Sequence, residues 1–279
     1  MRIVSLIENN CNNENLIREH GLSLYIEFEH KKILFDTGFS GDFIKNAEKL
    51  KINLKDIDYV IISHGHSDHC GGLKEFFKIN NKGIVFLKSS AIKDYYSESS
   101  GKAKYIGIDK ELLKTYTNRF KFIDNDTEIF KNGYIITNLL YKKDFKNEKT
   151  SLKKLEEKAL VNDDFQHELI FVAKEENNLI IFTGCSHNGI LNMIKTIMNK
   201  FKNCNIKSVI GGFHLVAFPD LNKLNCSENQ LEALGLSLLN LNIPKIYTCH
   251  CTGLKAYNLL KNILKDKLEY LDTGKEIIL

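Results

Sequence analysis

Residues 63–72 read Ser-His-Gly-His-Ser-Asp-His-Cys-Gly-Gly, and this stretch indicates a metal-binding loop. Its three histidines and one carboxylate are His64, His66, Asp68 and His69. Imidazoles and a carboxylate at this density form a borderline-soft ligand set that suits zinc and is tolerated by iron or manganese. Gly65 lets the backbone bend between two of the histidines, so that both imidazoles point the same way. A solvated histidine-rich loop is the alternative, and the flanking sequence disfavours it.

The flanks of this loop predict a strand before it and a helix after it. Asp-Tyr-Val-Ile-Ile at 58–62 is rich in β-branched and aromatic residues, which is typical of a buried strand. The glycines at 71–72 allow close packing ahead of an apolar helix near 72–79. The same patterns predict strands at the N-terminus, 22–36 (a hairpin), 84–87, 166–183 (a second hairpin), 207–210 and 245–248, and helices at 41–50, 188–202, 227–241 and 253–264. Hairpins and β-α alternation together predict a layered α/β fold.

The composition of the whole chain is that of a soluble globular protein. It has 279 residues, of which 43% are hydrophobic and 27% charged, and its net charge of +4 is spread over mixed Lys/Glu segments. We therefore expect a small-molecule substrate and no nucleic-acid partner. No apolar run is long enough to cross a membrane, so no membrane partner is expected either. Seven cysteines without regular spacing, and an N-terminus unlike a signal peptide, predict a reducing, cytoplasmic location.

Two stretches do not fit this pattern of strands and helices. Residues 95–120 and 141–165 are polar, lysine-rich and weakly patterned. Long loops in compact domains often cover a binding site. We therefore expect both stretches to be lid-like insertions.

Three further histidines stand where strands are predicted to end. His187, His214 and His250 each follow a strand-like run and lie beside Gly, Cys or Ser. A single histidine at the end of a strand is more often a hydrogen-bonded structural residue. Three in succession favour metal ligands at one edge of the sheet.

The H-x-H-x-D-H pattern at 64–69 resembles the metallo-β-lactamase superfamily. One of its subfamilies, the 7,8-dihydropterin-6-methyl-4-(β-D-ribofuranosyl)aminobenzene-5′-phosphate synthase-like metal-dependent hydrolases, is similar in further motifs. These are EHGLS (19–23), LFDTG (34–38), SHGHSDHCGGL (63–73), TGCSHNGI (183–190), GGFHL (211–215) and HCTG (250–253). The resemblance spans roughly residues 1–255. It implies a single domain over residues 1–279 with a four-layer αβ/βα sandwich and a metal site at one sheet edge.

The resemblance also implies metal ligands. His64 and His66 would bind a first ion, and Asp68, His69 and His250 a second. Either His187 or His167 completes the first site. His187 is preferred because it lies in the subfamily's own motif, whereas His167 precedes Cys185 by a spacing that other members of the superfamily use.

Three further residues bear on this implied metal site. Cys185 stands where a bridging aspartate usually lies, and it is either a thiolate ligand or a buried thiol. Asp36 is implied to orient the metal loop by hydrogen bonds rather than to bind metal. His66 stands where a redox branch of the superfamily has glutamate, so the hydrolytic branch is favoured.

These residues predict a hydrolase for a phosphate-containing or ester substrate. A bound cation activates water, and Asp68 is the expected proton acceptor. His214 is the expected proton donor, because it is placed by a motif yet exceeds the ligand count. Ser186 and Asn188 are expected to hold a phosphate or carboxylate at a helix N-terminus. The alternatives are a pterin-type group transferase and a metal-dependent sensor without turnover.

Overall fold

The computed structural model describes residues 1–99, 101–140, 151–217 and 220–279. The chain divides into two compact units. Unit one takes the described residues of Met1–Asp124, Glu148–Leu169 and Asp272–Leu279. Unit two takes those of Asn125–Asn147 and Ile170–Leu271.

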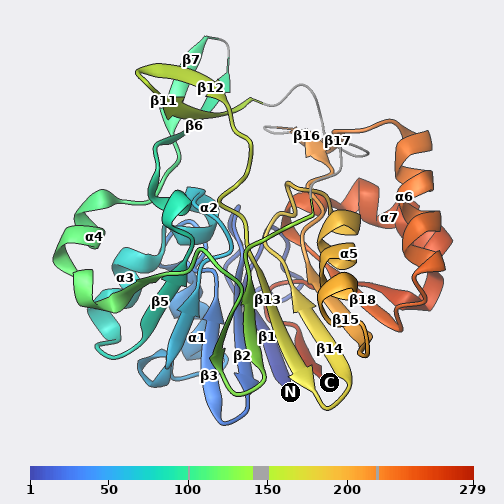
Figure 1. Cartoon of the computed structure of the whole chain (residues 1–279), viewed down its shortest axis with the longest axis horizontal. Coiled ribbons are helices and arrows are strands. Elements are labelled where there is room, and N and C mark those ends of the chain that lie inside the picture. The colour runs from blue at the N-terminus through green and yellow to red at the C-terminus, as the bar shows by residue number, and fades with distance from the viewer. Residues whose placement is uncertain (100, 141–150, 218–219) are drawn as a thin grey trace. The chain divides into compact units, whose positions relative to one another are not determined.

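Unit one is built on a seven-stranded sheet (Figure 1). Its strands, in spatial order, are β20 (Glu276–Ile278), β1 (Arg2–Ile7), β2 (Ser23–Phe28), β3 (Lys31–Phe35), β4 (Tyr59–Ile61), β5 (Ile84–Leu87) and β8 (Phe120–Phe122). The first four strands are antiparallel, and β3, β4, β5 and β8 run parallel. The β2–β3 hairpin turns at Glu29 and His30, whose positive φ angles of 49° and 58° suit a two-residue turn.

Helices cover one face of this sheet. They are α1 (Asp42–Lys49), α3 (Leu73–Ile79) and α4 (Lys110–Thr115), and the short α2 (Ser67–Cys70) lies in the predicted metal loop. Phe43 of α1 and Phe76 of α3 pack with alternate strand residues such as Leu34 and Val60 in one buried cluster. Burial of these apolar side chains is the main force that holds the helices on the sheet.

Unit two is built on a second seven-stranded sheet. Its order is β19 (Leu268–Tyr270), β18 (Lys245–Thr248), β15 (Asn205–Gly211), β14 (Asn178–Phe182), β13 (Ile170–Glu175), β10 (Gly133–Ile136) and β9 (Thr127–Phe130). β14, β15, β18 and β19 are parallel. The helices α5 (Ile190–Lys200), α6 (Glu228–Asn240) and α7 (Leu254–Leu264) pack on it through a second buried cluster. The hairpin of β16 (Val216–Ala217) and β17 (Asp220–Leu224) also belongs to this unit.

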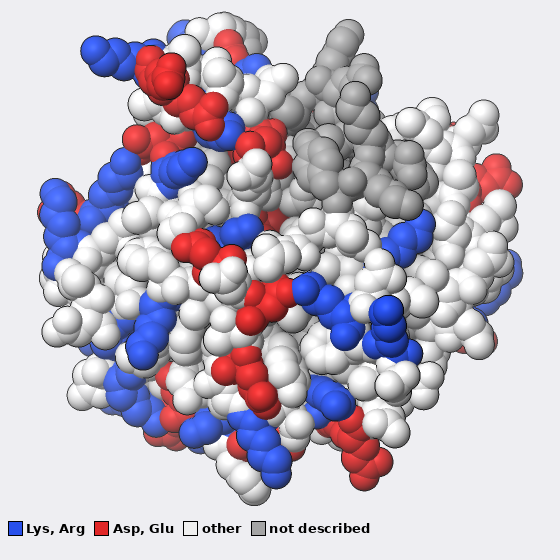
Figure 2. All heavy atoms as spheres, in the orientation of Figure 1, with Lys and Arg blue, Asp and Glu red and all other residues white. Residues whose placement is uncertain are grey.

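Each strand and helix that the sequence predicts has a counterpart within a few residues. Short 3-10 helices lie at Leu54–Asp56, Ser89–Ile92, Thr117–Arg119, His250–Thr252 and Lys265–Lys267. Among the described residues, no helix is long and apolar enough to span a membrane. On the face shown in Figure 2, basic and acidic side chains are mixed rather than gathered by sign.

The two stretches expected to be lid-like insertions, 95–120 and 141–165, contain strands that the sequence did not predict, where the structure describes them. Their strands form a four-stranded sheet within unit one, in the order β12 (Ala159–Asn162), β11 (Leu152–Glu156), β6 (Tyr95–Ser99) and β7 (Lys102–Tyr105) (Figure 1). These strands have only four or five residues each, and β6 pairs with β11 across a long stretch of chain. Local patterns do not reveal such distant pairing. Residues 141–150 lie outside the described residues.

Candidate metal centre

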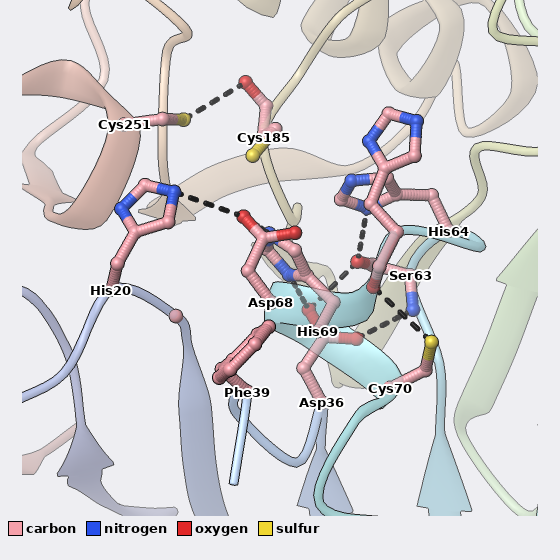
Figure 3. Close-up of polar contacts among 12 residues, drawn as sticks. His20, Asp36, Phe39, Ser63, His64, Asp68, His69, Cys70, Cys185 and Cys251 are labelled. Atoms are coloured by element: carbon pink, nitrogen blue, oxygen red, sulfur yellow. Dashed lines mark hydrogen bonds and ion pairs between the residues drawn. The ribbon is translucent and has the colours of Figure 1, made fainter. Parts of the chain in front are cut away.

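Asp36 lies at the carboxyl end of β3 and holds the residues around it by hydrogen bonds. Because β3 and β4 are parallel neighbours, the residues that follow them, Asp36 and Ser63, meet at one edge of the sheet. The buried carboxylate of Asp36 accepts hydrogen bonds from Ser63 N and Oγ at 2.7 Å each and from His69 Nδ1 at 2.6 Å (Figure 3). Asp36 thereby fixes both the start of the loop and its last histidine.

The same hydrogen bonds fix which ring nitrogen of two loop histidines carries the proton. His69 Nδ1 faces a carboxylate, which only accepts, so Nδ1 carries the proton and Nε2 carries the lone pair. Ser63 Oγ donates its one proton to Asp36, and it therefore accepts from His64 Nδ1 at 2.9 Å. His64 Nε2 then carries a lone pair too. Metals bind the lone pair of a neutral imidazole, so both rings are preset for ligation.

Burial keeps His64 in this neutral form. Its pKa lies well below the ordinary value, first because burial disfavours the charged ring and then because His69, His66 and His167 lie nearby. A neutral imidazole is the form that binds a metal ion. The electrostatics of the loop therefore favour metal over protons at His64.

The second loop histidine, His66, pairs with Asp163. His66 Nε2 lies 3.1 Å from Asp163 Oδ2, and the same oxygen lies 3.0 Å from His167 Nε2. Asp163 Oδ1 accepts from Phe165 N at 2.8 Å. Burial alone would raise the pKa of Asp163, but the hydrogen bonds with His167 and His66 outweigh it and lower that pKa. Asp163 is thus an ionised carboxylate that holds two imidazoles.

His167 uses both of its ring nitrogens within unit one. Gly65 N donates to His167 Nδ1 at 2.9 Å, so the ring proton lies on Nε2 and is donated to Asp163. The ring also stacks on Tyr95, with centroids 4.1 Å apart. Burial lowers the pKa of His167 to about 4, which agrees with a neutral ring. The ligand atoms of His66, Asp163 and His167 also lie within 4.8 Å of one another, so His167 and His187 both remain candidate metal ligands.

The depressed pKa of His167 predicts a pH-dependent stability. Unfolded His167 takes up a proton as the pH falls through about 6.5, whereas the folded ring stays neutral to about 4. The unfolded state then binds more protons, so stability falls with pH across this window. For the metal-stripped protein, His167 alone should remove about 2 kcal/mol of unfolding free energy between pH 7 and pH 5.

Urea unfolding at the two pH values measures this loss. In the His167→Gln variant the pH-dependent loss should shrink by that amount. His30→Gln, in the β2–β3 turn, is the matched control and should leave the loss unchanged. An unaltered pH dependence in His167→Gln would contradict a neutral, buried His167.

Asp68 lies in the first turn of α2 and faces a further imidazole, His20 (Figure 3). Asp68 Oδ2 is 3.5 Å from His20 Nε2 and 3.6 Å from His69 Nε2. Asn9 accepts from Gly21 N through Oδ1, so it donates through Nδ2 to His20 Nδ1 at 3.3 Å. His20 Nε2 therefore carries a proton that faces Asp68. The Asp68 side chain keeps 18% of its exposure, so water reaches it.

In unit two, the loops after parallel strands carry the other predicted residues. Cys185, Ser186, His187 and Asn188 follow β14, His214 follows β15, and His250 follows β18. Ser186, His214 and His250 have φ angles of 57°, 50° and 52°. Left-handed backbone at residues other than glycine is strained, and such strain clusters at functional sites. The rings of His187 and His214 lie 4.1 Å apart.

Ser186 and Asn188 lie just ahead of α5, whose first residue is Ile190. Ser186 is buried, and its hydroxyl donates to Thr183 Oγ1 at 3.0 Å. The carbonyl of Asn188 accepts from Asn192 Nδ2 at 2.8 Å. The Ser186 hydroxyl is thus engaged within its own loop, and the substrate-binding role of these two residues stays a prediction.

His214, the predicted proton donor, lies beside two thiols. The ligand atoms of Cys185, His214 and Cys251 lie within 4.8 Å of one another. Burial alone would raise the pKa of Cys251, but hydrogen bonds with Cys185 and His214, and the nearby His250, bring it well below its ordinary value. A ligand role therefore competes with the proton-transfer role predicted for His214.

Four residues of the described site are not among those predicted from the sequence: His20, Ser63, Asp163 and Cys251. His20, Ser63 and Cys251 lie inside the motifs EHGLS, SHGHSDHCGGL and HCTG, which were assigned other ligand residues or none. Asp163 stands four residues before His167, and this Asp-His spacing was the available signal. Its pairing with His66, 97 residues away, appears only in the folded chain.

The donor chemistry of both units fits a first-row metal ion. In unit one, the neutral rings of His64 and His69 present lone pairs, and Asp68 adds a carboxylate beside His69. In unit two, the thiols of Cys185 and Cys251 and the imidazole of His214 lie close together. Nitrogen, sulfur and carboxylate donors of this kind suit zinc.

Known proteins of one family resemble this chain along its sequence. The model of the Metallo-beta-lactamase superfamily matches residues 16–130. An uncharacterized protein of Methanocaldococcus jannaschii is 30% identical over 281 residues, which cover 99% of each chain. The 7,8-dihydropterin-6-methyl-4-(beta-D-ribofuranosyl)-aminobenzene-5'-phosphate synthase of the same organism is 31% identical over 274 residues, 93% of this chain and 90% of its own.

The structure also has a close counterpart among solved structures. The crystal structure of Tm1679, described as a metal-dependent hydrolase of the beta-lactamase superfamily, matches with a TM-score of 0.83 at 33% identity. The match covers 100% of this chain and 99% of the other. Together with the mixed sheets and helices, it confirms the predicted fold class.

Proposed function

The chain belongs to the metallo-β-lactamase superfamily, and from this premise we propose that it hydrolyses a phosphate-containing or ester small molecule with a bound metal ion. One observation carries the proposal. The Asp36 network presets the neutral rings of His64 and His69, with the lone pair of each on Nε2. Carboxylates that fix ligand tautomers in this way are typical of resident metal sites.

We assign the metal ligands as the sequence predicts them. They are His64, His66, Asp68, His69, Cys185, His187 and His250, with zinc as the proposed metal, one or two ions per chain. The assignment is supported by the family and by the donor types, which suit zinc. Asp36 and Asp163 hold His69 and His66 in place.

The chain's own residues supply the remaining chemistry. A bound divalent ion lowers the pKa of water toward neutrality and polarises a carbonyl or phosphoryl oxygen. Asp68 accepts a proton from the attacking water, since its carboxylate keeps solvent exposure. The His20 Nε2 proton faces the Asp68 carboxylate at an N–O distance of 3.5 Å.

A cytoplasmic, reducing location accompanies this proposal. All seven cysteines are in the reduced thiol form. Reduced thiols persist where glutathione and thioredoxin maintain them.

A second candidate function is group transfer. It is favoured by the 31% identity to a dihydropterin-type synthase over 93% of the chain. A transferase needs the same metal centre but passes the activated group to an acceptor other than water. The acceptor therefore distinguishes the two functions.

The test is an assay of zinc-loaded protein against p-nitrophenyl phosphate, bis-p-nitrophenyl phosphate and p-nitrophenyl acetate. We expect turnover of at least one of them that disappears after chelation and returns with zinc. His64→Ala should abolish it, whereas His30→Ala, in the β2–β3 turn, should not. Product formation only when an arylamine acceptor is added would favour the transferase. Zinc binding with no turnover in either assay would favour the sensor.

A further inference from the structure

Three parallel strands of unit two end in residues that a soft metal ion binds well. β14, β15 and β18 are neighbours in the sheet, and the loops that follow them carry Cys185, His214 and Cys251 respectively. Their ligand atoms lie within 4.8 Å of one another. Parallel strands bring their carboxyl ends to one sheet edge, so this convergence follows from the topology.

The imidazole of this group has a nitrogen that no described residue satisfies. His214 Nδ1 is buried and makes no hydrogen bond within the described part of the chain. Buried polar atoms are nearly always paired, so an unpaired ring nitrogen beside two thiols points to a missing ligand. In protein interiors such a buried nitrogen usually pairs with a bound ion or an ordered water.

The surroundings of Cys251 are shaped for its sulfur. Its Sγ accepts a hydrogen bond from the backbone N of His214 at 3.2 Å. A Cβ atom on Gly212 would lie 2.5 Å from that sulfur, so glycine is needed for this close approach. The Cys251 thiol donates to the carbonyl of Cys185 at 3.5 Å (Figure 3). Val216 packs on both cysteines and keeps them from solvent.

We propose that Cys185, His214 and Cys251 bind a thiophilic metal ion of the zinc class. Two thiolates and one imidazole are a known zinc set in which the fourth position is open to water or another donor. Hard ions such as Mg²⁺ prefer oxygen ligands and do not suit it. His214 and Cys251 belong to none of the ligand sets implied by the family resemblance. The site does not depend on the proposed hydrolase activity.

Cobalt substitution tests this site with Co²⁺ alone as the probe. Wild-type protein should show a thiolate-to-cobalt charge-transfer band in the near ultraviolet, which reports sulfur ligands. Cys251→Ser should lower that band to about half or less and should remove roughly one zinc equivalent in parallel samples, because the site loses one of its two thiolates and the ligands that remain hold the ion weakly. Cys204→Ser, a half-buried thiol of the same unit outside the group, is the matched control and should change neither. A full band and unchanged zinc in Cys251→Ser would overturn the proposal.

Further experiments control for misfolding of the Cys251→Ser variant. They also distinguish metal binding at this site from metal binding at the histidine loop, residues 64–69. His214→Ala should lose the same zinc equivalent; retention of all zinc would overturn the proposal and restore the proton-transfer role of His214. In the wild type, zinc should slow iodoacetamide alkylation of Cys251 but not of Cys204, as mapped by mass spectrometry, and equal slowing would count against the site. His64→Ala should keep the cobalt band while losing hydrolysis. Loss of hydrolysis without loss of the band thus tests the proposed function alone.

Discussion

The Asp68→Asn variant is expected to lower kcat by about 10²–10⁴-fold on the substrate that the wild type hydrolyses fastest, which is the usual range for losing a general base. The asparagine side chain keeps the size of the native one but accepts no proton and carries no charge. The Asp68 carboxylate lies 3.5 Å from His20 and 3.6 Å from His69, so its loss removes charge from the centre of the loop. Steady-state kinetics of the zinc-loaded variant measure the effect.

The fold should survive this change. Asp68 holds the start of β2 through its backbone carbonyl, which accepts from Leu22 N at 3.1 Å and is unaffected by the substitution. Asp42→Asn is the matched control, because Asp42 also lies in the first turn of a short helix of unit one. Its kcat should stay within a factor of about two of the wild type, since surface changes away from a site have small effects. Equal turnover in Asp68→Asn and the wild type would remove Asp68 from the mechanism.

The Asp36→Asn variant is expected to weaken zinc binding by about 10–100-fold, the usual cost of losing a carboxylate that orients a ligand. The introduced amide keeps an acceptor for Ser63 N but turns an N–H donor toward Ser63 Oγ and His69 Nδ1. His69 then shifts its proton to Nε2, which is the nitrogen set for the metal. Competition with a chromophoric chelator measures the change in affinity.

Asp36→Ala separates tautomer control from structural support. It removes the acceptor for three buried donors, so we expect a loss of about 3 kcal/mol or more in the free energy of unfolding. Asp36→Asn should lose clearly less stability while still losing zinc affinity. Full zinc affinity in Asp36→Asn would show that the hydrogen bond to His69 does not set the ligand.

The sequence predicted the elements whose patterns are local. The strand at 58–62, the β2–β3 hairpin and the helices α5 and α7 have clear local apolar patterns, and the structure shows all of them. The β6, β7, β11 and β12 sheet was missed because its strands are short and pair across distant segments. Periodicity reports burial along one segment and carries no information on which distant strand will pair with it.

The candidate site, like the fold, was predictable from the sequence only where its residues lie close together in the chain. The histidines and Asp68 are dense in sequence, so their type and spacing were enough to single them out. Asp163 reaches His66 only through the fold, and the tautomer of His167 depends on a single backbone amide, Gly65 N. Hydrogen-bond direction of this kind has no signature in residue spacing. For that reason the sequence left His167 and His187 as alternatives. In the structure His167 contacts Gly65 N and Asp163, and its ligand atom also lies within 4.8 Å of those of His66 and Asp163.

Metal content is the most direct test of the account, because every functional proposal depends on a preset ligand site. The protein should be purified without chelators and analysed for transition metals per chain. We predict at least one equivalent, chiefly zinc, which falls in Asp36→Asn and stays unchanged in Asp42→Asn. Less than about a third of an equivalent of any transition metal in the wild type would contradict the account, given the tight binding of such ligand sets.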